Sequence, residues 1–122
     1  MMEGLVQPLI LVLGGEREAR QLAAAALHEH GYDVVEAESA EAALGKLPPV
    51  SNLRAAVVCD TDGIDPAQLR DRLRAVRPEI GLVYLVDATA NRVHHNGGWT
   101  EIGKPAEPNQ IAYAVANLIA RD

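Results

Sequence analysis

Charged side chains follow several short runs of strand-forming residues in this chain, and their types are those that could carry chemistry. They are Asp60 and Asp62 after the run 54–59, Asp87 after 81–86 and Lys104 after 100–103. Clustered carboxylates can hold a divalent cation, whereas an aspartate beside a lysine can form a structural ion pair. Both interpretations require the ends of these runs to meet, so the elements that carry them decide the question.

Short apolar runs alternate with helical patterns along the whole chain. The expected strands are 9–13, 32–37, 54–59, 81–86 and 100–103, and the expected helices are 16–30, 39–46, 65–77, 89–96 and 107–121. Strict alternation implies βαβ units and a parallel sheet with helices on both faces. Right-handed crossovers then favour an α/β fold: a flavodoxin-like, doubly wound five-stranded parallel sheet in the order 2-1-3-4-5, with five helices in three α/β/α layers.

Single residues mark the ends and the buried faces of these helices. Gly31 is a C-terminal signal for the first helix, and Ser39 and Asp65 are N-caps for the second and third. The spacing of apolar residues in the first helix predicts one buried face, formed by Leu22, Ala23, Ala26 and Leu27.

The topology also predicts where a ligand would bind. In doubly wound sheets the site lies outside the carboxyl ends of the strands, at the switch between strands 1 and 3. The residues that this rule places there are Gly14, Gly15 and Glu16 from strand 1, Asp60 and Asp62 from strand 3, Val86 and Asp87 from strand 4, and Lys104 from strand 5.

Composition limits the classes of function. With 122 residues and 48 % hydrophobic content, we expect a single domain over 1–122. The net charge of −6 argues against a nucleic-acid partner, since phosphate binding needs clustered Lys and Arg. Cys59 is the only cysteine and lies in an apolar run, which favours a buried thiol and a cytoplasmic, reducing location. No apolar run is long enough for a signal sequence or a membrane span, so no membrane partner is expected.

Two motifs carry a resemblance to a known family. Asp60 at the end of the third apolar run and Lys104-Pro105 after the fifth resemble the phospho-accepting aspartate and the lysine of bacterial response-regulator receiver domains, the chemotaxis-regulator-like family. The resemblance covers essentially the whole chain. It implies a stand-alone receiver-like domain in two-component (phosphorelay) signal transduction, with Asp60 as the phospho-acceptor and Lys104 as the partner of Asp60 and of the phosphoryl group.

The chain departs from the family pattern at four positions. Gly14 and Gly15 stand where the resemblance places an acidic pair that holds magnesium, Val86 stands where it places a Ser or Thr, and Glu101 stands where it places a mobile aromatic residue. Formation of an aspartyl phosphate relies on a divalent ion, and magnesium needs several oxygen ligands. We therefore expect a pseudo-receiver without a resident cofactor, in which Mg²⁺ binds weakly, if at all, through Glu16, Asp60 and Asp62.

The same resemblance implies protein partners. These would be a histidine kinase, another regulator, or a second copy of the chain bound through helix 4, strand 5 and helix 5. The candidate residues on that face are His94, His95, Trp99, Glu101 and Tyr113, and Trp and Tyr are enriched among binding hot spots. The alternative for Trp99 is that it packs over a short fourth helix.

Three other interpretations stay open. Asp60 could be a working phospho-acceptor with a rebuilt metal site, or it could form only a structural ion pair with Lys104. A small-ligand or nucleotide-binding flavodoxin-like domain is the third, although 14–19 lacks the G-x-G-x-x-G spacing. No Ser-His-Asp or Cys-His pairing falls at the expected strand ends, so the chain is not expected to be an enzyme.

Overall fold

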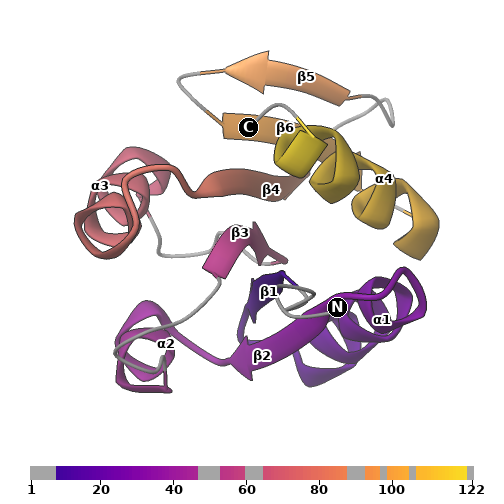
Figure 1. The fold of residues 1–122 in the computed structure, drawn as a ribbon, viewed down its shortest axis with the longest axis horizontal. Helices are drawn as coiled ribbons and strands as arrows, with labels where there is room; N and C mark the ends of the chain where they lie inside the picture. The colour runs from indigo at the N-terminus through magenta and orange to yellow at the C-terminus, as the bar shows by residue number, and fades with distance from the viewer. Residues whose placement is uncertain are drawn as a thin grey trace, which may run out of the picture.

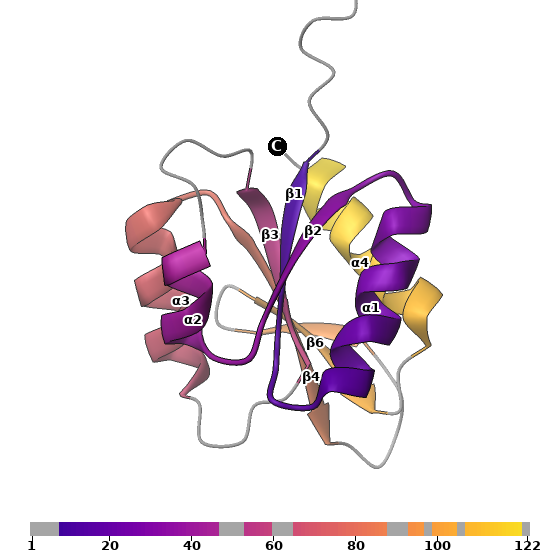
Figure 2. The ribbon, with the colours of Figure 1, turned by 90° about the horizontal axis from the view of Figure 1, so that it is seen from below.

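The computed structural model describes residues 8–46, 53–59, 65–87, 93–96, 99–104 and 107–120. They form four helices and six strands: β1 (Leu9–Leu13), α1 (Arg17–Glu29), β2 (Asp33–Ala37), α2 (Ala40–Lys46), β3 (Leu53–Val58), α3 (Pro66–Val76), β4 (Gly81–Asp87), β5 (Val93–Asn96), β6 (Trp99–Lys104) and α4 (Pro108–Ala120). The sheet is the middle of three layers, with α2 and α3 on one side and α1 and α4 on the other (Figures 1 and 2).

The sheet has the order β2-β1-β3-β4-β6-β5, in which all neighbours are parallel except β5 and β6. The five parallel strands confirm the predicted fold class and the order 2-1-3-4-5, with β6 as the fifth. The predicted helix at 89–96 is wrong, because Val93–Asn96 forms β5, a sixth strand antiparallel to β6. The described part of the chain therefore has four helices rather than five.

The sequence contains a signal for this sixth strand. Asn96 is the register partner of Trp99, and the two residues between them in the sequence are both glycines. A two-residue Gly-Gly connection between β-forming runs is typical of a hairpin. That signal outweighs the weak helical pattern of the same segment.

The predicted helix boundaries are supported by specific hydrogen bonds. The Asp65 carboxylate accepts from the backbone N–H groups of Ala67 and Gln68, at 3.0 and 3.3 Å, so it caps α3 as predicted. The Ser39 hydroxyl accepts from the N–H of Ala42 at 3.1 Å, which confirms the cap of α2. Gly31 ends α1 with a φ of 89°, a left-handed conformation that favours glycine.

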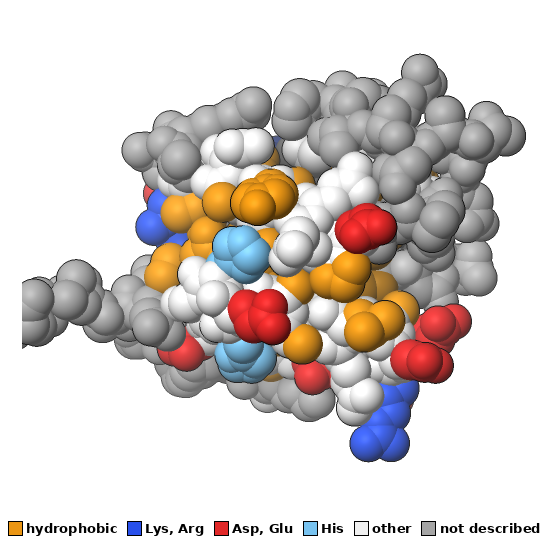
Figure 3. All heavy atoms as spheres, turned by 90° about the vertical axis from the view of Figure 1, so that its right-hand side faces the viewer, with side chains coloured by type: hydrophobic (Ala, Val, Ile, Leu, Met, Phe, Trp, Pro, Cys, Tyr) orange, Lys and Arg blue, Asp and Glu red, His pale blue; other side chains and the backbone are white. Residues whose placement is uncertain are grey.

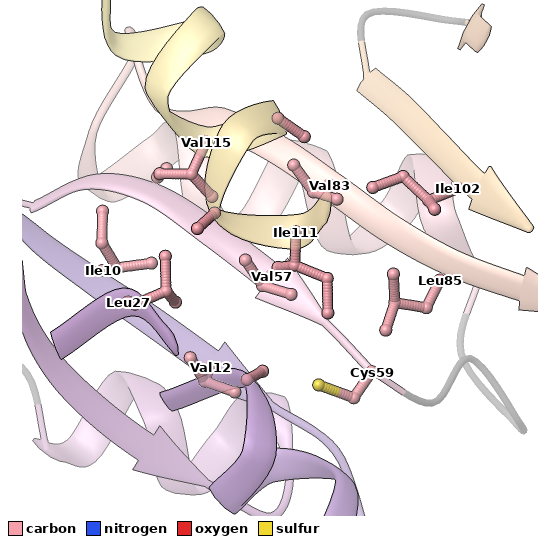
Figure 4. Packing of buried hydrophobic residues seen from close by; sticks show 14 residues of the cluster. Ile10, Val12, Leu27, Val57, Cys59, Val83, Leu85, Ile102, Ile111 and Val115 are labelled. Atoms are coloured by element: carbon pink, nitrogen blue, oxygen red, sulfur yellow. The ribbon is translucent and has the colours of Figure 1, made fainter. Parts of the chain in front are cut away.

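The core consists of two apolar clusters, one on each face of the sheet. Successive residues of β1 alternate between them, because side chains alternate across a strand. The cluster under α1 and α4 (Figure 4) includes Ile10, Val12, Leu27, Val57, Cys59, Val83, Ile102, Ile111 and Val115. The cluster under α2 and α3 includes Leu11, Leu13, Ala43, Val58, Leu69, Leu73, Leu82 and Tyr84. Cys59 is a buried thiol, as predicted.

The buried face of α1 differs from the prediction at one residue. Leu22 is 57 % exposed, and the buried residues are Arg20, Ala23, Ala24, Ala26 and Leu27. From Arg20, the positions i+3, i+4 and i+7 follow one stripe of the helix, and Leu22 lies to one side of it. Arg20 therefore lies on the buried face of α1, and Leu22, which the spacing of apolar residues predicted to be buried, does not.

Candidate functional site

The carboxyl ends of β1 and β3 lie side by side, as the topology predicts. Leu13 is the register partner of Val58, and the N–H of Cys59 donates to the Leu13 carbonyl at 2.7 Å. This bond carries the pairing one residue past the end of β3. Asp60 is the next residue, and it lies with Asp62 outside the described residues. The structure thus places the segment that leads into Asp60 at the predicted switch point.

The ends of β4 and β6 meet at the same edge of the sheet. Val86 is the register partner of Gly103, and Asp87 is the partner of Lys104. The backbone of Lys104 therefore lies at the carboxyl edge, where the resemblance places the lysine of the site. Asp87 lies directly opposite it on the neighbouring strand.

The end of β1 presents glycine and an exposed carboxylate. Gly14 is buried, and its N–H donates to the Ala37 carbonyl at 3.0 Å, whereas Gly15 and Glu16 are exposed. Glu16 is the N-cap residue of α1 with an extended backbone, but its side chain makes no capping hydrogen bond. A carboxylate here is favoured by the helix dipole. Glu16 is thus a solvated acid next to the switch point.

A buried arginine at this end of the sheet was missed by the sequence analysis. The Arg20 Nη1 donates to the Gly14 carbonyl at 2.7 Å, and its Nε lies 3.5 Å from Oε1 of Glu36 on β2. Arg20 therefore links α1, the end of β1 and β2. Its signal in the sequence is a charged residue on the apolar stripe of α1, where a buried cation needs partners.

Val86 and Glu101 occupy two of the positions that depart from the family pattern. The side chain of Val86 is partly buried and packs against the apolar cluster under α2 and α3. Glu101 on β6 is also partly buried, and its Oε2 accepts a hydrogen bond from Nε1 of Trp99 at 2.9 Å. Glu101 thus fixes the orientation of the indole ring.

Trp99 lies between a buried tyrosine and an arginine of α3. Its ring meets the Tyr84 ring edge-to-face with centroids 5.4 Å apart, and the Arg70 guanidinium carbon lies 5.4 Å from the Trp99 centroid. These geometries favour aromatic and cation–π attraction. Burial raises the pKa of Tyr84 to about 12, against the opposing charges of Arg70 and Arg74. Trp99 therefore packs beside α3, and the predicted fourth helix over which it could have packed is absent from the described residues.

The remaining interaction candidates are distributed over different parts of the molecule. His94 and His95 lie on β5, opposite Glu101 and Thr100 of β6. Tyr113 is 61 % exposed on α4, and its ring meets that of His30 edge-to-face at 5.7 Å. This face, over α1 and α4, combines hydrophobic, histidine and acidic side chains (Figure 3). Because α4 covers the opposite side of the sheet from Trp99, the fold does not bring Trp99 and Tyr113 together.

The described residues lack two features, a metal-binding cluster and a membrane-spanning helix. They contain no group of three or more His, Cys, Asp or Glu side chains arranged to hold a metal ion. None of their helices combines the length and the apolar character that crossing a membrane requires.

Comparisons with known proteins bear on the fold. No family model matches the sequence, and neither does any curated protein. Solved structures do match it. A response regulator receiver protein from Sinorhizobium medicae is 21 % identical, with a TM-score of 0.74 over 95 % of this chain and 97 % of that chain. A CheY-like response regulator receiver domain protein from Methanospirillum hungatei is 14 % identical, with a TM-score of 0.73 over 94 % and 95 %. The receiver domain of the hybrid histidine kinase CckA is 22 % identical, with a TM-score of 0.72 over 91 % and 98 %. The chain therefore has the fold of receiver domains.

Proposed function

We propose that this protein is an atypical receiver domain that acts in two-component (phosphorelay) signal transduction through protein–protein contacts, with impaired or absent Mg²⁺-dependent phosphorylation. The general role is supported by the receiver fold of its structural neighbours. The atypical character is inferred from the residues at the carboxyl edge of the sheet.

The end of β1 is the observation that carries the proposal. The chain turns from β1 into α1 through Gly14 and Gly15, which have no side-chain oxygens, and the carboxylate that follows, Glu16, is exposed. Magnesium dehydrates reluctantly and demands a near-octahedral set of oxygen ligands held in place. Because the end of β1 supplies no carboxylate at Gly14 or Gly15 and only the exposed Glu16 beyond them, we infer that Asp60 lacks the fixed partners that would hold the ion.

The proposal includes the other parts of the function. The partner is a protein, such as a histidine kinase or another regulator, and a homodimer is included among the contacts. Nucleic acid is not a partner, because the acidic chain repels phosphate. The protein is cytoplasmic and has no enzymatic activity of its own.

A phosphorylation assay tests the proposal. The protein is incubated with acetyl phosphate and Mg²⁺, and separately titrated with Mg²⁺ and beryllofluoride, while the emission of Trp99 is followed. We expect Mg²⁺ binding weaker than millimolar and no incorporation of phosphoryl at Asp60. Sub-millimolar binding that Asp60→Asn abolishes, or stoichiometric phosphorylation, would support the working phospho-acceptor instead. A ligand bound stoichiometrically in the purified protein would support the nucleotide-binding alternative.

A rescue variant tests which residues cause the defect. Gly14→Asp combined with Gly15→Asp is expected to strengthen Mg²⁺ binding, because it restores two carboxylates next to Asp60. Gly14→Asn combined with Gly15→Asn is the matched control, since it adds two side chains of similar size without the charge. Equal Mg²⁺ affinity in the double variant and the parent would show that the end of β1 is not the metal-binding position.

A further inference from the structure

The outer edge of β5 is a row of backbone groups at one end of the sheet. β5 pairs with β6 on one side, and no strand among the described residues pairs with its other side. Figure 1 shows β5 at the outside of the sheet, beyond β6. An edge strand presents N–H and C=O groups that can pair with a strand of another chain.

The two edges of the sheet differ in how they are protected. Charged residues and prolines on an edge strand discourage pairing with another chain. β2, at the opposite edge, carries Asp33 and Glu36, and Glu36 lies 3.5 Å from Nε of Arg20. β5 has the sequence Val-His-His-Asn, which contains no lysine, acid or proline. Of the two edges, β5 is therefore the one whose sequence permits a further strand.

The hairpin that contains β5 is locally neutral, although the chain is acidic. Residues 93–104 contain one acid, Glu101, and one base, Lys104, whereas the whole chain has a net charge of −6. Two copies with this charge repel one another, but charges more than about 8 Å apart are largely screened at physiological ionic strength. A contact between two β5 strands therefore brings together the segments that repel least.

The pairing of β5 with β6 decides which backbone groups point outwards. In an antiparallel pair, alternate residues direct their N–H and C=O groups towards the partner strand, and the others direct them away from it. Asn96 and Trp99 are register partners with two residues between them, and the residues that close a two-residue hairpin face each other through hydrogen bonds. By alternation from Asn96, we expect the backbone groups of Val93 and His95 to point outwards.

We propose that β5 is a homodimer interface, at which the β5 strands of two copies pair antiparallel about a two-fold axis at His94. In this register, Val93 of each copy exchanges backbone hydrogen bonds with His95 of the other, and the two sheets become one. Such an isologous contact closes at two copies, whereas head-to-tail pairing of β5 with β2 would continue without end. The inference deepens the proposed function, on whose protein–protein contacts it rests, by naming a second copy and the strand that binds it.

The two-fold axis places His94 of one copy directly opposite His94 of the other. Like charges at directly opposite positions of an antiparallel pair are destabilising. Neutral imidazoles fit this position, whereas the imidazolium ions that form below about pH 6.5 repel. On β6, the described strand that pairs with β5, the titratable residues are Glu101 and Lys104, and Glu101 is the register partner of His94. Attraction between His94 and Glu101 is present in monomer and dimer alike, so it does not offset the repulsion between copies.

Sedimentation equilibrium tests the association of the parent protein. Because pairing of two four-residue strands buries a small interface, we expect a weak dimer, measurable between about 10 µM and 1 mM at about pH 8, and no larger species. Lowering the pH to about 5.5 is expected to raise the Kd by about fivefold or more. His94→Gln does not titrate, so its Kd should change by less than about twofold over the same range.

Charge-reversal variants locate the axis. His94→Lys and His94→Asp each place like charges opposite one another, so each is expected to raise the Kd by about fivefold or more. An equimolar mixture of the two should restore the dimer, because Lys then faces Asp. His28→Lys and His28→Asp are the matched controls, since His28 is an exposed histidine of α1, and they are expected to change the Kd by less than about twofold.

Amide hydrogen exchange of the parent tests the backbone pairing without any variant. Circular dichroism checks that the His94 variants are folded, and if one is not, the exchange measurement decides. We expect the amides of Val93 and His95 to be protected at about 1 mM and to lose protection on dilution, whereas those of His94 and Asn96 change little.

Three outcomes would overturn the inference: a monomer over the whole concentration range, the same Kd in His94→Lys and the parent, or species that grow beyond the dimer. A monomer whose Val93 and His95 amides gain protection from a designed Val-Thr strand peptide would overturn it in favour of a strand of a different protein. Asp60→Asn is measured in parallel and is expected to leave the Kd of the dimer unchanged. Failure of the dimer and failure of the phosphorylation prediction are therefore distinguishable.

Discussion

The strands inside the sheet differ from β6 in how they are covered. β1 and β3 lie between parallel neighbours and are buried on both faces except at Leu9 and Arg54, whereas β6 is buried on one face and pairs with the antiparallel edge strand β5 on its far side. A strand covered on both faces requires a nearly continuous apolar sequence, because side chains on both faces are removed from water. A strand covered on one face can carry Trp99 and Glu101 on the other, and these are side chains that a partner can contact.

The largest loss of stability is expected in the core between α1 and the interior strands of the sheet. Leu27 packs in the apolar cluster under α1 and α4 and is 0 % exposed to solvent, whereas Leu22 on the same helix is 57 % exposed. Leu27→Ala is expected to lower the free energy of unfolding by about 2–5 kcal/mol, since it leaves a cavity under α1. Leu22→Ala, the matched control, is expected to change it by less than about 0.5 kcal/mol. Urea denaturation measures both, and similar losses in the two variants would contradict the assigned face of α1.

The same contrast explains which features the sequence could predict. The strand at 9–13 is apolar throughout and the strand at 54–59 is apolar after Arg54, so their type and their parallel neighbours followed from their apolar sequences. The segment 89–96 lacks such a pattern, because β5 lies at the edge and makes contacts mainly with β6. Its strand character comes from pairing with β6, and the local sign of that hairpin, the two glycines between Asn96 and Trp99, was given less weight than the helical pattern.

The candidate site was predictable only in part, for a similar reason. Topology and motifs placed Gly14, Gly15 and Lys104 at the carboxyl edge, and the backbone of each lies there. Arg20 was missed because its function depends on the Gly14 carbonyl and on Glu36 of β2, two partners that only the folded chain brings together. Apolar spacing gives no weight to a charged residue on a buried stripe.

The next prediction concerns the ionisation of Tyr84 on β4, the strand between β3 and β6. Burial raises its pKa from the ordinary value of 10 to about 12. The neutral phenol is thus favoured in the folded state, so this contribution to stability is fully present below pH 10 and is lost as the pH rises towards 12. The expected loss is about 2 kcal/mol by pH 12.

Two measurements check the Tyr84 prediction. Alkaline titration of tyrosinate absorbance should show one of the three tyrosines ionising later than the others. Tyr84→Phe, in which nothing at this position titrates, should lose less stability than the parent between pH 10 and 12. A parent and variant with parallel pH profiles would show that Tyr84 is solvated, and hence that the incompletely covered surface extends to β4.

A third prediction concerns the carboxyl edge of β6. If Lys104 pairs with Asp60 without a metal, Lys104→Met leaves a carboxylate without its counter-charge and is expected to destabilise the protein by about 1–3 kcal/mol. Adding Asp60→Leu is expected to recover part of that loss, because the unpaired charge is then removed. Denaturant midpoints of the two single variants and the double variant form the cycle. Additive losses would argue against the structural pair and in favour of a reactive site.

The smallest effect is expected at the partly exposed face of β6 itself. Trp99→Phe keeps an aromatic ring beside Tyr84 but removes the Nε1 donor to Glu101, so we expect a loss of about 0.5–1.5 kcal/mol, well below that of Leu27→Ala. Glu101→Gln is the control, because its amide oxygen can still accept from the indole, and its loss should be smaller still. If Trp99→Phe instead costs as much as Leu27→Ala, Trp99 is a core residue whose packing is complete within the chain. β6 would then be covered as completely as the strands inside the sheet, and the contrast between them would not hold.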